Sequence, residues 1–246
     1  MMPAVERRSG TRTWLVPAVV LLVCAALLAL ALIRDGASEV AGGDAAGAPG
    51  SESRGEQPSD EAPPALDLER RDPDDPLTDG PVDAPLTLVV YSDYQCPFCA
   101  SWAHETLPTM REYAAAGELR IEWRDVNILS DVSERASIAS YAAGLQDRFW
   151  EYHEELFRGG EIRSASELTD QDLVDLAVDV GLDEGRFVED MAAAGTVEAI
   201  DRNAEEGRAA GVFSTPAFVL DGQPMLGAQP TQVFVDMIDR SLQDGA

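Results

Sequence analysis

Residues 91–99 read YSDYQCPFC, and they set the fold expected for the whole chain. The apolar run Leu86–Tyr91 is typical of a buried strand, and a helical pattern begins directly after Cys96. This order puts Cys96 and Cys99 in the first turn of a helix that leaves a strand. Free N–H groups and the positive end of the helix dipole favour a thiolate there. The sequence therefore predicts an activated pair of thiols.

The pattern on either side of the thiols predicts a β-α-β unit. Spaced large side chains over residues 97–116 indicate a helix after the first strand, and Pro108 should kink it. Apolar and charged residues then alternate over 119–128, which indicates a second strand.

Helical spacing continues over about residues 131–210. Strand signals return at 217–220 and 224–226, separated by an Asp-Gly turn signal, and an amphipathic helix follows at 230–243. The predicted order of elements is therefore β-α-β, a helical insertion, and β-β-α.

The N-terminal residues form a membrane signal. Residues 14–33 carry no charge and are long enough to cross a bilayer as a helix. Three arginines precede this run and only Arg34 follows it closely, so we expect a transmembrane anchor at 13–34, with residues 1–12 cytoplasmic and the remainder outside. A cleaved signal peptide is the alternative, because Ala29-Leu30-Ala31 resembles a cleavage site.

Residues 35–76 are dominated by small, acidic and proline residues. They contain too few large apolar side chains to offset the entropy lost on ordering, so we expect a disordered linker. The remaining residues, 77–246, have the size of a single domain.

The net charge and the cysteine content limit the classes of function that the chain can have. The chain has a net charge of −27 and no lysine, and a surface this acidic repels nucleic acid. Disulfides persist outside the cytoplasm, yet Cys96 and Cys99 are the only cysteines beyond the anchor. A bridge between such close neighbours closes too short a loop to add much stability. A redox pair explains two and only two cysteines better than a structural disulfide does.

Three more stretches of sequence, together with the stretch that contains the thiols, indicate a family resemblance. Residues 80–85 read GPVDAP, 149–157 read FWEYHEELF, and 211–218 read GVFSTPAF. With the thiol stretch, they make the chain resemble the membrane-anchored bacterial branch of the DsbA-like thiol–disulfide oxidoreductases, over about residues 77–246. The resemblance implies an α/β thioredoxin fold with a helical subdomain inserted at about 131–210.

The thiols have unequal roles in the expected chemistry. Cys96 is expected to be an exposed nucleophile, and Cys99 a more buried resolving thiol of higher pKa. Pro97 suits the first helical turn and Phe98 carries no charge, so both tune the redox poise. We expect the pKa of Cys96 to be lowered, but less than in the strongest oxidants.

Thr215-Pro216 is the second predicted element of the site. Proline is where cis peptide bonds occur. The resemblance implies that cis-Pro216 packs against the two thiols and that the backbone of Thr215 pairs with the main chain of the substrate.

The resemblance also implies partners. Substrates are exported proteins that contain cysteine, and a membrane redox partner must recycle the thiols after each turnover. No organic cofactor and no metal are expected. A reductase or isomerase that uses the same residues is one alternative, and a non-catalytic peptide-binding module of thioredoxin fold is another.

One position departs from the family pattern. Many relatives carry an acid six residues before the first cysteine, and Val90 stands there in this chain. The group that takes the proton of Cys99 is therefore open. His104 and His153 are interpreted as surface or packing residues, and a metal site at the thiols would need one of them.

Overall fold

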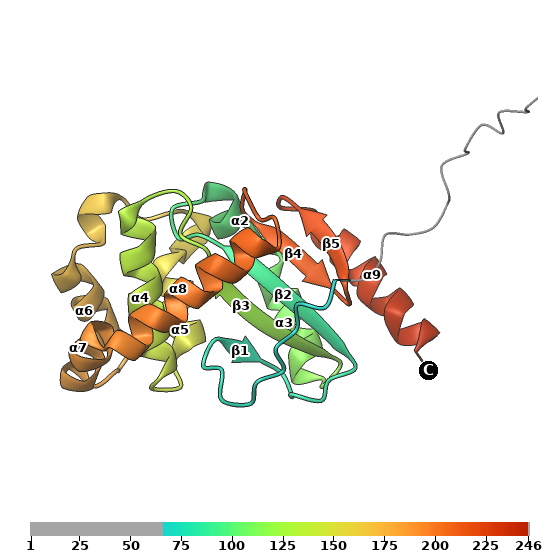
Figure 1. Ribbon diagram of the computed structural model, residues 1–246, viewed down its shortest axis with the longest axis horizontal. Helices are drawn as coiled ribbons and strands as arrows, with labels where there is room; N and C mark the ends of the chain where they lie inside the picture. The colour runs from blue at the N-terminus through green and yellow to red at the C-terminus, as the bar shows by residue number, and fades with distance from the viewer. Residues whose placement is uncertain (1–65, 246) are drawn as a thin grey trace, which may run out of the picture. The chain divides into compact units, whose positions relative to one another are not determined.

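A five-stranded sheet forms the centre of the part of the chain that the computed structural model describes, residues 66–245 (Figure 1). The strands lie in the order β1-β3-β2-β4-β5. Only the β2–β3 pair is parallel. The strands are β1 (Thr78–Asp79), β2 (Leu86–Ser92), β3 (Leu119–Asp125), β4 (Ala217–Leu220) and β5 (Gln223–Leu226).

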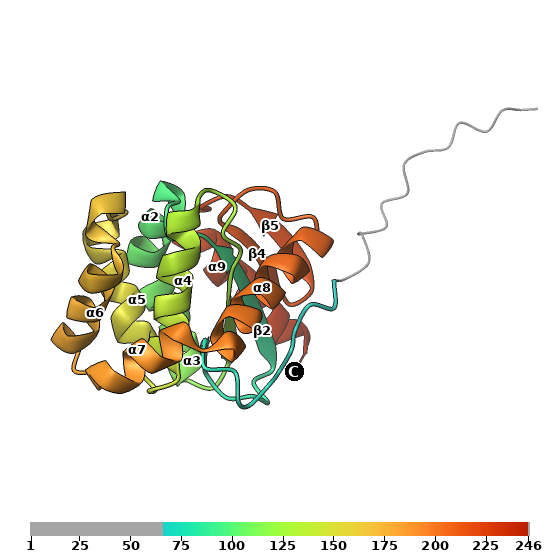
Figure 2. The ribbon, with the colours of Figure 1, turned by 60° about the vertical axis from the view of Figure 1, so that its left-hand side comes forward.

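Helices cover both faces of this sheet and extend beyond one side of it (Figures 1 and 2). The helices are α2 (Pro97–Glu105), α3 (Leu107–Ala115), α4 (Asp131–Gly144), α5 (Phe149–Leu156), η1 (Arg158–Gly160), η2 (Ala165–Glu167), α6 (Asp170–Asp179), α7 (Glu184–Ala192), α8 (Ala194–Ala209) and α9 (Thr231–Asp244). The predicted order of β-α-β, helices and β-β-α is confirmed, and the short strand β1 was not predicted.

The alternation of side chains along the strands divides the core into two layers. Val90 of β2 lies opposite Trp123 of β3 and Phe218 of β4, and all three face the larger core cluster. Their neighbours Val89 and Tyr91 belong to a smaller cluster. Since successive side chains of a strand point to opposite faces, the smaller cluster lies on the other side of the sheet.

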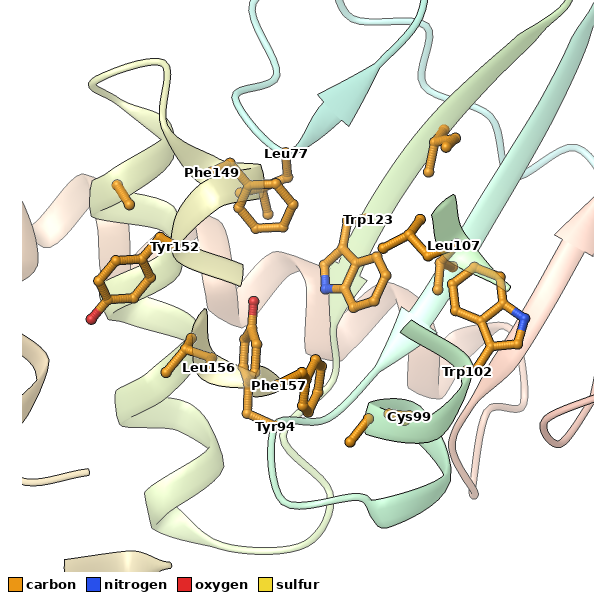
Figure 3. Packing of buried hydrophobic residues seen from close by; sticks show 14 of the residues in the cluster. Leu77, Tyr94, Cys99, Trp102, Leu107, Trp123, Phe149, Tyr152, Leu156 and Phe157 are labelled. Carbon is orange, nitrogen blue, oxygen red and sulfur yellow. The ribbon is translucent and has the colours of Figure 1, made fainter. Parts of the chain in front are cut away.

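Aromatic rings join the helix that carries the thiols to the rest of the larger core. The ring centroid of Trp123 lies 6.4 Å from that of Trp102 in α2 and 6.3 Å from that of Phe149 in α5 (Figure 3). Cys99 belongs to the same cluster and is 1% exposed. The start of α2 is therefore held by packing on the sheet and on the helical insertion.

The single helix predicted over residues 97–116 is two helices. α2 ends at Glu105, and α3 begins at Leu107 with Pro108 in its first turn. The break has a physical reason, because proline lacks the N–H that would continue the α2 hydrogen bonds. The helical stretch expected over about 131–210 is likewise divided into several helices, of which α4 and α5 are the first two.

Residues 66–76, predicted as the end of the linker, are ordered against the domain instead. The backbone N–H groups of Arg70 and Arg71 donate to the carboxylate of Glu122 at 2.9 Å and 2.7 Å. Glu122 is fully buried, and it pairs with Arg120 and Arg124 on the smaller-cluster face of the sheet. A buried charge needs several donors, and this segment supplies two of them.

Helix α8 also departs from the predicted insertion of 131–210. Its Ala199 and Ile200 are buried, and at its end Gly207 approaches the sheet so closely that an added Cβ would lie 2.6 Å from Val126 Cγ1. The last turns of α8 therefore belong to the sheet layer.

The predicted cytoplasmic residues 1–12, the anchor at 13–34 and the first part of the linker, residues 35–65, lie outside the described residues. Within residues 66–245, no helix combines the length and the apolar character needed to cross a membrane.

Candidate active site

Both thiols lie where α2 leaves the loop that follows β2. Cys96 is the N-cap residue with an extended backbone, and Pro97 occupies the first helical position. The N–H of Cys99 donates to Cys96 O at 3.0 Å, and the Cys96 N–H donates to Asp93 O at 3.0 Å. The predicted location of the thiols at a helix start is confirmed, and both cysteines are free.

Cys96 has the character of the nucleophile. A hydrogen bond from the Cys99 thiol, helped by the backbone N–H groups of Cys99 and Phe98, lowers the pKa of Cys96 to about 6 against the opposing effect of burial. The predicted exposure of Cys96 is wrong, because the residue is only 4% exposed. Thr215 covers it, with the thiol donating to Thr215 O at 3.2 Å.

Cys99 has the opposite character. Burial, and then the neighbouring Cys96, raise the pKa of Cys99 well above its ordinary value. The prediction of a buried resolving thiol with the higher pKa agrees with this geometry. A pair with one ionised and one protonated sulfur is suited to thiol–disulfide exchange, because the first attacks and the second completes the exchange.

Thr215 and Pro216 lie beside Cys96, although more than 100 residues separate them in the sequence. Their peptide bond is cis, as predicted. Pro216 directly precedes β4, and its carbonyl oxygen accepts from Gly227 N–H at 2.8 Å. The β4–β5 hairpin therefore holds the cis-proline segment against the thiols.

Exposed apolar side chains lie on segments that adjoin the thiols. Phe98 is 67% exposed and Phe213, two residues before Thr215, is 82% exposed. Leu226, whose strand position pairs with the residue after Pro216, is 65% exposed. We call Phe98, Phe213 and Leu226 the apolar rim. Of these three, only Phe98 is predicted from the sequence as a site residue, because exposure of the other two depends on the folded arrangement.

Two buried carboxyl groups lie at the ends of β2 and β3. Asp93 accepts from Gln95 N–H, Ser133 Oγ and Leu129 N–H at 2.6–3.0 Å. Asp125 accepts from Trp123 Nε1 at 2.9 Å. Both residues are 0% exposed. The sequence analysis does not single out Asp125, because in the sequence it is one more charged residue of an alternating strand.

Neither histidine touches the thiols in a way that indicates a metal site. His104 is exposed on α2. His153 is buried, with its Nδ1 3.0 Å from the Tyr94 hydroxyl, as expected for a packing residue. Among residues 66–245, no three Cys, His, Asp or Glu side chains are grouped as metal ligands would be.

The thiol pair at a helix start, the cis-proline beside it and the mixed sheet define a thioredoxin-type protein. A family model described as thioredoxin matches residues 73–240, and the chain belongs to this family.

Solved structures that share this fold include proteins of the DsbA type, all at low sequence identity. BdbD from Bacillus subtilis has a TM-score of 0.61 at 21% identity, covering 68% of this chain and 92% of that one. α-DsbA1 from Wolbachia pipientis has a TM-score of 0.62 at 18% identity, covering 70% and 92%. A thioredoxin-like oxidoreductase from Silicibacter pomeroyi has a TM-score of 0.58 at 24% identity, covering 69% and 98%.

Curated relatives are much longer proteins. The chain is 34% identical over 157 residues to Na⁺/H⁺ antiporter NhaA 1 of Salinispora arenicola. This match covers 62% of this chain and 22% of the antiporter. NhaA 3 of Salinispora tropica is 31% identical over 155 residues, with the same coverage. The chain thus spans about a fifth of the length of these relatives. The antiporter activity in their names is therefore not assigned to this chain.

Proposed function

We propose that this protein is an extracytoplasmic thiol–disulfide oxidoreductase that donates disulfides to exported proteins through Cys96 and Cys99. The observation that carries the proposal is the geometry of the pair: Cys96 caps the start of α2 beside the cis Thr215-Pro216 peptide, and Cys99 is buried one turn further on. A stabilised thiolate favours the reduced form of the pair, which makes the corresponding disulfide an oxidant.

The reaction has two exchange steps. A substrate thiolate attacks Cys96 Sγ of the Cys96–Cys99 disulfide, and Cys99 leaves as a thiolate and takes up a proton. A second substrate thiolate then attacks the substrate sulfur of this mixed disulfide, and Cys96 leaves as a thiolate. The substrate has gained a disulfide, and the pair has gained two electrons.

Binding of the substrate is assigned to the cis-proline segment and the apolar rim. The backbone of Thr215 lies beside Cys96, where it can pair with an extended substrate segment. Phe98, Phe213 and Leu226 offer apolar surface around that segment. Such a surface favours cysteine-containing segments that are unfolded or partly folded, whose apolar side chains are still available.

The sequence supports the proposed location, and turnover of the pair requires a redox partner. The uncharged run at residues 14–33, with arginines before it, supports an anchor in the cell membrane with the N-terminus in the cytoplasm and the catalytic domain outside. A membrane redox partner then reoxidises the pair by accepting its two electrons.

A disulfide reductase or isomerase is the second candidate. The pKa of Cys96 is about 6. Cysteine pKa values are roughly 3.5 in DsbA and roughly 7 in thioredoxin, so this value alone does not assign the direction.

The reduction potential of the full-length protein in detergent decides between these directions. The protein would be equilibrated with glutathione buffers while tryptophan fluorescence is followed, with Trp102 a suitable reporter. A potential between about −120 and −180 mV supports disulfide donation, and one near −270 mV or below supports reduction. If no reversible transition occurs, a non-catalytic binding module replaces both enzymes.

A further inference from the structure

Cys99 must lose a proton in each cycle, yet its surroundings oppose ionisation. When the reduced pair is reoxidised, Cys96 first forms a mixed disulfide with the oxidant, and Cys99 must then attack Cys96 as a thiolate. Cys99 is 1% exposed, and Val90, which faces the same core, has no polar group. Bulk water is therefore not in contact with this thiol, and a neighbouring group has to accept the proton.

Ser92 is the polar side chain of β2 next to Cys99. It is 1% exposed, and its Oγ has no hydrogen-bond partner in the described part of the chain. Its hydroxyl favours the thiolate form of Cys99. Because Ser92 lies two residues after Val90, it points to the face of the sheet that carries α2. A buried hydroxyl without a partner is costly, so a function at the thiol accounts for its presence.

Asp125 lies directly across from Ser92. The two residues are Cα partners in the parallel β2–β3 pair, so their backbones are about 5 Å apart and their side chains share one face. The oxygens of Asp125 receive one short hydrogen bond, from Trp123 Nε1 at 2.9 Å, and a long one from Ser140 Oγ at 3.5 Å. The oxygens of Asp93 are already bonded to three donors. Asp125 is the buried carboxyl with capacity for a proton.

We infer that Cys99 is deprotonated by a relay through Ser92 to Asp125, which deepens the thiol–disulfide exchange proposed above and rests on it. In the mixed disulfide, the Ser92 oxygen accepts the proton of Cys99 while its own hydroxyl proton passes to the Asp125 carboxylate. The Cys99 thiolate then attacks Cys96 Sγ and closes the disulfide, and the thiolate of the oxidant leaves. Asp125 holds the proton until the next cycle. Ser92 lies next to the reacting thiol, and Asp125 acts through a hydrogen bond with Ser92 that forms in the mixed disulfide and is absent from the reduced structure.

The surroundings of Asp125 suit a proton acceptor at neutral pH. Burial, with a smaller contribution from the charge of Asp93, raises the pKa of Asp125 to about 7, although the bonds from Trp123 and Ser140 oppose the shift. The other ionisable groups near Asp125 are Asp93, which accepts from three donors, Tyr94, whose pKa burial raises well above its ordinary value, and His153, whose pKa burial lowers to about 3. Tyr94 and His153 are therefore uncharged near pH 7.

A disulfide reagent separates the two thiol steps. When the reduced full-length protein reacts with dithiobis(nitrobenzoate), Cys96 attacks first and releases one thionitrobenzoate. Cys99 then attacks the mixed disulfide and releases the second, with loss of its proton. Stopped-flow absorbance therefore gives a first phase for Cys96 and a second phase for Cys99. We expect the rate of the second phase in the wild type to rise with pH and to level off above about pH 7.

Asp125→Asn tests the acceptor, because asparagine can still accept from Trp123 but cannot accept a proton. We expect this variant to slow the second phase at pH 8 by about 10²-fold and to abolish the levelling near pH 7, while the first phase keeps its rate. Asp125→Glu should restore much of the rate. Ser92→Ala should slow the second phase in the same way, and it tests the relay independently if the Asp125 variants do not fold.

Glu105→Gln, which removes an exposed acid of α2, is the matched control and should leave both phases unchanged. A second phase in Asp125→Asn and Ser92→Ala with the wild-type rate and pH profile would overturn the relay. If the wild type itself shows no second phase, the proposed exchange function fails, which is a different result.

Discussion

At the scale of single residues, the site depends on two sulfurs with opposite environments. Cys96 is stabilised as a thiolate by the thiol and N–H groups at the start of α2, whereas Cys99 is held as a thiol by burial. Each residue thus shifts the pKa of the other, and a change at one position should be visible at the other.

The pKa of Cys96 can be read from alkylation rates. Iodoacetamide should modify the reduced protein with a midpoint near pH 6, because only the thiolate reacts. In Cys99→Ala, the midpoint should rise towards the free-cysteine value of about 8.5, because the largest stabilising hydrogen bond is lost. An unchanged midpoint in Cys99→Ala would show that the helix start alone activates Cys96.

At the scale of elements, two contacts on the face opposite the thiols hold the sheet in place. The end of α8 lies against Val126, and the segment 66–76 lies over Glu122. Both contacts involve β3 or the residue directly after β3. Strand β3 pairs with β2, the strand that leads to the thiols. Their loss should affect stability without altering the thiol chemistry directly.

The close approach of α8 is tested by Gly207→Ala. The added Cβ would lie 2.6 Å from Val126 Cγ1, so we expect a loss of about 1–3 kcal/mol in the free energy of unfolding. Gly195→Ala in the same helix is the control, since nothing lies within 4 Å of its added Cβ. That variant should keep or slightly raise the stability. Urea unfolding measures both, and equal effects would contradict the packing argument.

The buried charge on β3 is tested by Glu122→Ala. This change leaves Arg120 and Arg124 buried without their shared carboxylate, and it removes the acceptor for the N–H groups of the 66–76 segment. We expect a loss of about 3–5 kcal/mol. Glu112→Ala, on the exposed surface of α3, should change stability by less than about 0.5 kcal/mol. A small effect at Glu122 would mean that the ion pairs contribute little.

At the scale of the whole molecule, the redox state and the folding stability are linked. The reduced protein contains a Cys96 thiolate that the folded state stabilises, and the oxidised protein lacks it. Whatever stabilises the reduced fold over the oxidised fold also makes the disulfide more oxidising.

This linkage has a definite sign with pH. The folded pKa of Cys96, about 6, lies below the unfolded value of about 8.5, so the unfolded chain binds more protons between these values. The stability of the reduced form relative to the oxidised form should therefore rise from pH 6 to about 8 and be lost as the pH falls through 6. Urea midpoints of both forms at several pH values measure it. A difference that does not change over this range would refute the lowered pKa.

Local sequence patterns determined the order of elements and the principal site. The thiols at a strand–helix junction follow from residues 91–99 alone, because apolar periodicity and helix-start chemistry act over short distances. The Thr215-Pro216 peptide was expected from a family resemblance. The breaks between helices were less predictable, because propensity places an element more reliably than its ends.

Only the tertiary structure decided what meets in space. Thr215 covers Cys96, and Ser92 pairs with Asp125, so each contact joins segments that are distant in the sequence. The exposure of Phe213 and Leu226 likewise depends on the folded arrangement. The ordering of residues 66–76 likewise depends on a buried carboxylate some 50 positions away. Burial and cross-strand register are properties of the assembled sheet, so no local pattern carries them.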